Sequence, residues 1–298
     1  MVNANELCND CPRRCNVDRN IHKGYCRSGN TVKVARAALH MWEEPCISGK
    51  NGSGAIFFSG CNMQCVFCQN KDIASGEIGK EITIERLAQI MIELQDKNAN
   101  NINLVTPSHY VNQIVEAIKL AKRDGLSIPI VYNTSAYETA ENLKKLEGLV
   151  DVYLPDCKYY DDELAVSYSK APEYHSISLK VIAEMLRQTG KVVFDEDNII
   201  KKGVIVRHMV MPGHTKDSKS VIKAIFEEFG ADVYVSIMSQ YTPLKQVENY
   251  PELNRRITTR EYDKVLSYAL DIGLVNGFFQ DMDVAEESFI PLFDLEGV

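Results

Sequence analysis

Residues 55–70 read Ala-Ile-Phe-Phe-Ser-Gly-Cys-Asn-Met-Gln-Cys-Val-Phe-Cys-Gln-Asn, an apolar run followed by Cys61, Cys65 and Cys68. The apolar run predicts a strand, so the cysteines lie on the loop after it. Iron–sulfur clusters are normally held by four thiolates, and a loop with three leaves one iron open. A substrate or cofactor can bind at an open metal position. The alternative is a zinc site whose fourth ligand lies elsewhere in the chain.

Short β-rich runs alternate with helical patterns from residue 54 onward. The predicted strands are residues 55–59, 102–106, 128–133, 149–154, 204–210 and 232–238. Amphipathic helical stripes occur between them, at residues 84–94, 111–118 and 221–226, with a further one at 262–269. This alternation implies a parallel sheet, and six units suit an α/β fold, a partial (β/α)6 TIM-type barrel. Residues 191–203 are predicted to form a hairpin or excursion before the fifth strand.

In barrels of this class, catalytic groups lie at the carboxyl ends of the strands. The three-cysteine loop follows the first predicted strand, so it should lie at that edge. Candidate polar residues also lie at the ends of the second to fifth strands, in the runs 103–109, 132–135, 154–159 and 207–214, which begin with Asn103 and include Arg207 at the fifth strand end. The sequence therefore predicts one site built from several strand ends.

Composition places the chain among ordinary globular proteins. Its 298 residues are 45% hydrophobic and 25% charged. It has no apolar run near the roughly 20 residues that span a bilayer, and its first residues do not read as a signal peptide. We therefore expect a cytoplasmic protein with no membrane partner. The net charge of −8 argues against nucleic acid as the main partner, because binding phosphates needs clustered Lys and Arg.

A second set of cysteines precedes the predicted barrel. Nine cysteines in a chain without an export signal indicate metal ligands or reduced thiols, not disulfides. Four of them satisfy the ligand count of an auxiliary iron–sulfur cluster or of a structural zinc ion: Cys8, Cys11, Cys15 and Cys26. Uncoordinated thiols are the third interpretation. We expect residues 1–50 to form a Cys-rich metal-binding extension of the barrel, which would cover residues 51–298, and we expect Cys46 and Cys157 to pack in the core.

The Cys-x3-Cys-x2-Cys spacing resembles the signature of the radical S-adenosylmethionine (SAM) superfamily. Similarity extends along nearly the whole chain to the pyruvate formate-lyase activating-enzyme-like group, and within it to the uncharacterised PflX branch. It is carried by Cys-Pro-Arg-Arg-Cys, Glu-Glu-Pro-Cys-Ile-Ser-Gly, Val-Thr-Pro-Ser-His and Met-Pro-Gly-His. The resemblance implies a [4Fe–4S] cluster whose fourth iron is chelated by SAM, and an anaerobic oxidoreductase. One electron, from a donor such as flavodoxin or ferredoxin, would give methionine and a 5′-deoxyadenosyl radical.

The resemblance also implies SAM contacts at the strand ends. Asp156 and Lys158 match an Asp-x-Lys strand end that contacts SAM, and Asn133 and Thr134 match a neighbouring Asp-Thr pair. Where the activating enzymes have Gly-Gly-Glu for the SAM amino group, this chain reads Leu-Val-Thr, which ends at Thr106. The acidic side chain is missing, so Thr106 or a backbone carbonyl would have to replace it. Without the family resemblance, Asp156 and Lys158 could form a partly exposed salt bridge at a strand end, which is a common and weak feature.

Three functions follow from these patterns. The first is a radical SAM enzyme whose radical abstracts hydrogen from a macromolecule, such as a glycyl-radical-type protein. The second is a radical SAM enzyme that modifies a small molecule, for example a mutase or cyclase. The third is a non-catalytic iron–sulfur or zinc protein for electron transfer or scaffolding. Formation of 5′-deoxyadenosine from SAM separates the first two from the third.

Overall fold

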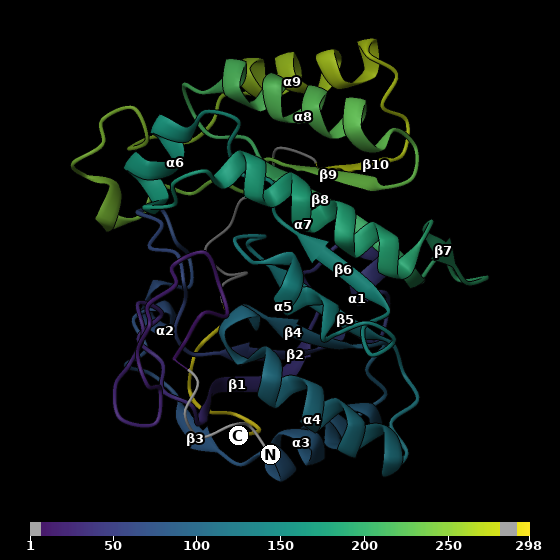
Figure 1. The fold of residues 1–298 in the computed structure, drawn as a ribbon. Coiled ribbons are helices and arrows are strands. Elements are labelled where there is room, and N and C mark those ends of the chain that lie inside the picture. The colour runs from purple at the N-terminus through teal and green to yellow at the C-terminus, as the bar shows by residue number, and fades with distance from the viewer. Residues whose placement is uncertain (1–6, 281–290) are drawn as a thin grey trace.

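The computed structural model describes residues 7–280 and 291–298, and they form an α/β fold around one long sheet (Figure 1). The strands are β1 Val32–His40, β2 Ser53–Phe58, β3 Lys80–Ile82, β4 Ile102–Val105, β5 Ile130–Thr134, β6 Val152–Pro155, β7 Val193–Phe194, β8 Ile200–Met209, β9 Tyr234–Met238 and β10 Gly277–Phe279. The α-helices are α1 Pro45–Ser48, α2 Lys71–Ala74, α3 Ile84–Asp96, α4 Val111–Arg123, α5 Ala140–Lys144, α6 Asp162–Ser169, α7 Tyr174–Thr189, α8 Thr215–Phe229 and α9 Thr259–Asp271. Short 3-10 turns lie at Ser108–Tyr110 and Lys245–Val247.

The sheet has the order β10-β9-β8-β6-β5-β4-β2-β1-β3. Strands β2, β4, β5, β6, β8, β9 and β10 are parallel to their neighbours in that order, whereas β1 pairs antiparallel with β2 and β3. All six predicted strands are present as β2, β4, β5, β6, β8 and β9, and the expected hairpin is β7 paired antiparallel with β8. The mostly parallel α/β architecture of a partial TIM-type barrel is confirmed.

The sequence reading did not include β1, β3 and β10. Strand β1 lies within the expected N-terminal extension, yet it pairs with β2 along Arg36–His40 and belongs to the main sheet. Strand β10 adds a seventh parallel strand, next to β9. The stretch without helix or strand is therefore shorter than residues 1–50 and covers residues 7–31 of the described chain.

The largest core lies between the sheet and the helices packed against it (Figure 1). The predicted stripe of α3 supplies fully buried Leu87, Met91 and Leu94, and that of α8 supplies Val221 and Ile225. At the start of α9, Thr258 and Glu261 form a capping box that satisfies amides of the first turn. The helices thus bury one side of the parallel strands and hold the strands in register, so that their carboxyl ends lie along one edge of the sheet.

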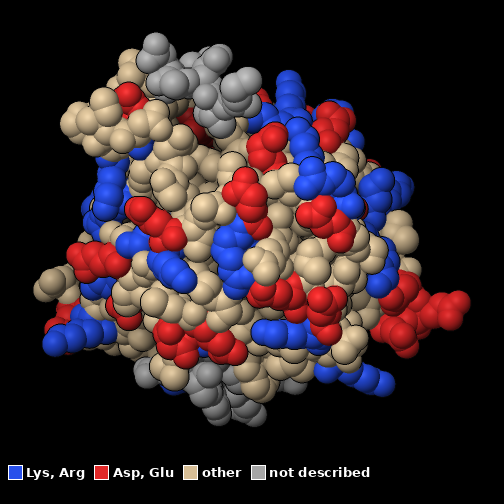
Figure 2. Space-filling model, turned by 90° about the horizontal axis from the view of Figure 1, so that it is seen from below, with Lys and Arg blue, Asp and Glu red and all other residues tan. Residues whose placement is uncertain are grey.

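None of the described helices is long and apolar enough to cross a bilayer. Acidic and basic side chains are interspersed on the face shown in Figure 2. A nucleic-acid site needs basic side chains gathered together. That face of the described chain therefore does not offer a continuous basic surface.

Candidate active site

The three-cysteine loop lies beside a cavity at the carboxyl edge of the parallel strands. The cavity has a volume of about 270 Å³, and Cys61, Cys65 and Cys68 all line it. It is also lined by residues at or just beyond the carboxyl ends of strands β4, β5, β6 and β8, namely Thr106, Asn133, Thr134, Asp156, Lys158 and Arg207. All the predicted SAM-contacting side chains are therefore brought to the same cavity as the three thiols.

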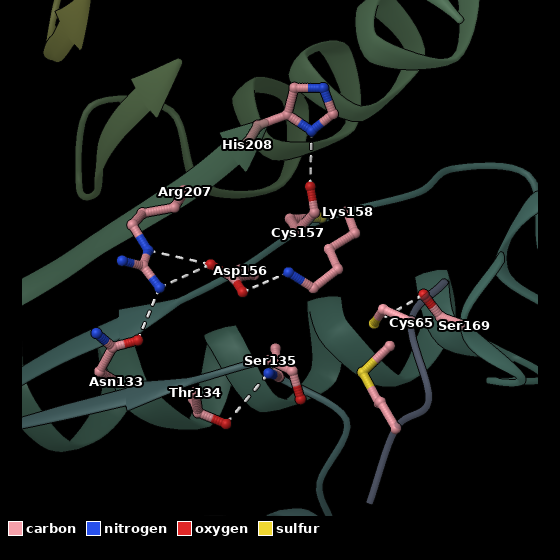
Figure 3. Close-up of polar contacts among 12 residues, drawn as sticks. Cys65, Asn133, Thr134, Ser135, Asp156, Cys157, Lys158, Ser169, Arg207 and His208 are labelled. Carbon is pink, nitrogen blue, oxygen red and sulfur yellow. Dashed lines mark hydrogen bonds and ion pairs between the residues drawn. The ribbon is translucent and has the colours of Figure 1, made fainter. Parts of the chain in front are cut away.

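A network of ion pairs joins several of the residues that line this cavity (Figure 3). Lys158 Nζ lies 2.6 Å from one oxygen of Asp156, and Arg207 Nε donates to the other oxygen at 3.0 Å. Their side chains are only 14–18% exposed. The pair at the end of β6 is thus part of a buried network and not the solvated ion pair of the alternative interpretation. Buried charges of this kind are held only when they are paired and hydrogen-bonded.

Arg207, from the predicted end of the fifth strand, joins this network, and Glu43 is a functional candidate that the sequence pattern did not indicate. Arg207 on β8 donates to Asn133 Oδ1 at 2.7 Å and lies 3.3 Å from Glu43 Oε2. Glu43 precedes α1, lines the cavity and accepts from the amides of Asn103 and Asn133 at 3.1 and 3.2 Å. The available signal for Glu43 is the Glu-Glu-Pro-Cys motif, whose acidic residues are opposite in charge to Arg207.

The environment sets the charges of this network. Burial alone would raise the pKa of Asp156, but Lys158 and Arg207 outweigh it and lower that pKa below its ordinary value. Burial opposes the charge of Lys158 as well, and Asp156 raises the pKa of Lys158 in spite of it. Burial raises the pKa of Glu43, against the effect of Arg207. The Asp156–Lys158–Arg207 group is therefore ionised at neutral pH.

The two threonines differ in how free their hydroxyl groups are. Thr106 follows β4 with φ +59°, a left-handed conformation that is strained for a β-branched residue, and its amide donates to the Asn133 carbonyl at 2.9 Å. Such outliers concentrate at functional sites. Thr134 instead gives its hydroxyl proton to buried Glu138, and its oxygen accepts from Ala136 N at 3.2 Å. Thr134 therefore serves the strand end, and Thr106 is better placed for a ligand.

The loop thiols have the contacts that a metal-bound thiolate needs. Ser169 Oγ donates to Cys65 Sγ at 3.0 Å, Tyr159 lies 2.6 Å from the same hydroxyl, and Met63 N donates to Cys61 Sγ at 3.4 Å. Burial raises the pKa of Cys61 to about 12, so without a cation this thiol is neutral. A bound metal deprotonates coordinating thiols. Three half-buried thiols beside a cavity, two of them with N–H or O–H donors, fit an iron–sulfur cluster with an open iron.

The remaining cysteines and histidines near the strands serve packing. Cys157 is fully buried with its sulfur 3.7 Å from Ser178 Oγ, and Cys46 is buried in an apolar cluster beneath the sheet. His208 Nδ1 lies 2.7 Å from the Cys157 carbonyl, and His109 Nε2 lies 2.8 Å from the Ser59 carbonyl. Burial lowers the pKa of His208 to about 4 and that of His109 to about 3, so both are neutral.

The N-terminal cysteines lie on the described loop of residues 7–31, where Cys11 and Cys26 are buried and Cys8 and Cys15 half-buried. The described residues contain no group of three or more His, Cys, Asp or Glu side chains that is gathered as a ready metal site. This holds for both cysteine sets, so each would have to draw its sulfurs together around a metal.

These features define a partial TIM-type barrel whose three-thiol loop and polar strand ends enclose one cavity. Residues 55–225 match the sequence profile described as the Radical SAM superfamily, and the chain belongs to that superfamily. An uncharacterized protein of Methanocaldococcus jannaschii is 31% identical over 271 residues, which cover 88% of this chain and 74% of that protein. A pyruvate formate-lyase-activating enzyme of Clostridium pasteurianum is 26% identical over 193 residues, 60% of this chain and 70% of the enzyme.

Solved structures agree on the fold. The crystal structure of methylornithine synthase superposes with a TM-score of 0.53 at 16% identity, over 79% of this chain and 63% of that one. The chain thus spans less than two thirds of that structure. Membership in the superfamily implies a [4Fe–4S] cluster and SAM, and within it the chain is similar to an activating enzyme.

Proposed function

We propose that this protein is a radical SAM activating enzyme that abstracts hydrogen from a glycyl-radical-type protein. Its [4Fe–4S] cluster would be held by Cys61, Cys65 and Cys68. When bound, the cluster and SAM supply a 5′-deoxyadenosyl radical after one electron arrives from a donor such as flavodoxin or ferredoxin. The observation that carries the proposal is the cavity that the three thiols share with the ion network of the strand ends.

Residues at the strand ends would hold SAM. Asp156 and Lys158 offer both signs of charge, Asn133 an amide, and Thr106 a hydroxyl at the cavity wall. Glu43 offers the carboxylate that Leu-Val-Thr lacks at the end of β4, because it reaches the same cavity from the segment before α1. We assign Glu43 to the ammonium group of SAM. Arg207 holds Glu43, Asn133 and Asp156 in place through its three contacts.

The protein substrate is supported by the relative and by the cavity rim. The Clostridium pasteurianum relative is named for activating pyruvate formate-lyase. At the rim, Trp42 lines the cavity while 57% exposed, and the adjacent Met41 is 45% exposed. Exposed apolar side chains beside a reactive cavity suit contact with a chain segment that enters it. The radical position must exclude water, which such a segment would do by covering the opening.

SAM cleavage is the first test. The anaerobically reconstituted, dithionite-reduced protein should convert SAM to 5′-deoxyadenosine, detected by chromatography and mass spectrometry. Cys65→Ser should abolish this conversion, and Cys46→Ala, which changes a buried thiol away from the cavity, should retain it. A wild-type protein with an intact cluster that makes no 5′-deoxyadenosine would overturn the proposal.

The substrate class needs its own test. Pyruvate formate-lyase labelled with deuterated glycine should transfer deuterium into 5′-deoxyadenosine and give a glycyl radical signal in electron paramagnetic resonance. Unlabelled lyase is the control. Transfer from deuterated small molecules, with none from the labelled protein, would leave SAM cleavage standing and reject the protein substrate.

A further inference from the structure

The N-terminal segment, residues 7–31, has cysteines where a folded segment normally has an apolar core. It contains no helix or strand, and its only buried residues are Cys11, Cys26 and Ser28. Its aliphatic Leu7 and Ile21 are instead 53% and 74% exposed. A segment this small cannot be ordered by so little apolar burial and needs a staple such as a metal. The buried thiols of Cys11 and Cys26 indicate that such a metal would be bound by the cysteines.

All four cysteines of the segment are tied into neighbouring turns. Cys8 N donates to the Val17 carbonyl at 2.9 Å and the Cys8 carbonyl accepts from Asn16 N at 3.0 Å, which brings the two ends of the first turn together. On the other side, Tyr25 N donates to Cys15 Sγ at 3.2 Å. N–H···S bonds of this kind stabilise a thiolate.

Two of the sulfur atoms approach one another from these turns. A Cβ placed on Gly24 would lie 3.6 Å from the sulfurs of both Cys15 and Cys26, so these two sulfurs flank the same glycine. Cys11 is buried in the same segment, and its carbonyl accepts from Arg14 N at 3.0 Å. A bound metal would have to draw the Cys8 and Cys11 sulfurs the remaining distance to this pair.

The segment is also seated directly on the catalytic loop. Cys61 N donates to the Cys26 carbonyl at 3.2 Å, and Arg13 Nε donates to the Asn62 carbonyl at 2.8 Å. The Arg13 guanidinium lies over the ring of Tyr25, within the segment, at 4.0 Å and over the ring of Tyr137, in the barrel, at 5.0 Å. Whatever orders the segment thus also supports the loop that carries Cys61.

We propose that the segment is a second metal centre, in which a thiophilic metal is bound by Cys8, Cys11, Cys15 and Cys26. Four thiolates satisfy either a zinc ion or an iron–sulfur cluster, so this centre is closed to further ligands. It does not rest on the proposed radical function, because it follows from the segment alone. Its place against Cys61 means that metal loading there secures one side of the catalytic loop.

The test isolates the second centre by deleting the first. In the full chain carrying Cys61→Ser, Cys65→Ser and Cys68→Ser, iron, acid-labile sulfide and zinc are counted after anaerobic purification and reconstitution. We expect either about one zinc or about four irons with matching sulfide per chain. Zinc defines a structural centre and iron with sulfide a cluster, and both support the proposal. The absence of bound metal, with the four thiols alkylated freely or joined in disulfides, would overturn it.

A matched pair of variants guards against misfolding. In the otherwise native chain, Cys8→Ser with Cys11→Ser should remove the second centre and leave the iron of the Cys61 loop, while Cys46→Ser should leave both. Proteolysis within residues 7–31 should accelerate only in the first variant. Equal metal content in the two variants would contradict the assignment of these cysteines.

Discussion

The two cysteine sets of this protein lie in contact but in opposite surroundings. The loop of Cys61, Cys65 and Cys68 lines a cavity whose other wall is a buried ion network on parallel strand ends. None of the described residues 7–31 lines that cavity, and their four cysteines lie in turns without helix or strand. Three thiols that line a cavity suit a metal that takes a further ligand. Four thiols outside the cavity suit a metal that only holds its segment in place or passes electrons.

The comparison teaches that ligand count and surroundings change together. The open set is supported by a rigid sheet, which can hold charged groups in place around a reacting ligand. The N-terminal set has no such sheet beneath it. Its own thiols occupy the place that an apolar core would take in the segment. The two sets are joined by the hydrogen bond from Cys61 N to the Cys26 carbonyl.

The largest effect that separates the two surroundings should come from Arg207→Met. This change leaves Glu43 without its cation and Asp156 with Lys158 alone, and breaking a buried ion pair costs about 3–5 kcal/mol. Urea unfolding of the metal-free protein at pH 7 measures the loss. The matched control is Arg187→Met, because the exposed Arg187 guanidinium pairs with Glu147 and Glu184 at the surface and should contribute little.

The pH dependence of that loss identifies its cause. The pKa of Asp156 is lowered in the folded protein, so its contribution to stability is present above its unfolded pKa and disappears as the pH falls through the folded pKa. The gap between native protein and Arg207→Met should therefore stay constant from pH 7 to about 4 and narrow only below about pH 4. A gap that stays constant below pH 4 as well would show that packing, not charge, connects the strand ends.

A smaller effect should come from disturbing the contact between residues 7–31 and the loop that carries Cys61. Gly60 has φ +88°, and a Cβ there would lie 2.5 Å from the Cys26 carbonyl oxygen and clash with the Ser28 hydroxyl. Gly60→Ala should cost about 1–3 kcal/mol and loosen residues 7–31, because the backbone of the segment must move. Hydrogen exchange of residues 7–31 in the metal-free protein measures the loosening.

Gly125 offers the matched control for that clash. It also has a positive φ, +108°, but a Cβ there would meet nothing within 4 Å. Gly125→Ala should therefore show backbone strain alone and leave exchange in residues 7–31 unchanged. If both variants loosen the segment equally, its seat on the catalytic loop is not what orders it.

Much of this arrangement could be predicted from the sequence, for reasons that differ between residues. The parallel strands were predicted because each is a short apolar run, and strand ends converge by topology, which placed Asp156 and Lys158 near the cysteines. β1 was missed because its Arg36 and polar ends obscure the run, and its pairing with β2 is set only in the folded chain.

The missed site residues share a different cause. Glu43 reaches the cavity from a segment far from β8 in the sequence, and its contact with Arg207 joins positions 164 residues apart. No local pattern predicts such a pair. Ser169 closes α6, which read as an ordinary helix, and its contact with Cys65 depends on how that helix packs over the loop.

The smallest and most specific effect should come from Ser169→Ala. Its hydroxyl donates to Cys65 Sγ, and hydrogen bonds to cluster sulfurs set the reduction potential by stabilising the more negative, reduced form. Removing one such bond, worth about 1 kcal/mol, should make the potential of the Cys61-loop cluster more negative by on the order of tens of millivolts. A titration followed by electron paramagnetic resonance measures this directly.

Two further variants decide whether the sulfur contact is the cause. Ser167→Ala changes an exposed serine on the same helix and should leave the potential unchanged. Tyr159→Phe removes the group that lies 2.6 Å from the Ser169 hydroxyl and should give a smaller shift of the same sign. The N-terminal centre provides an internal reference, because its potential, if it holds iron, should not move in any of the three variants. A shift of both centres together would mean that α6 repacks and that the hydrogen bond to Cys65 is not the origin.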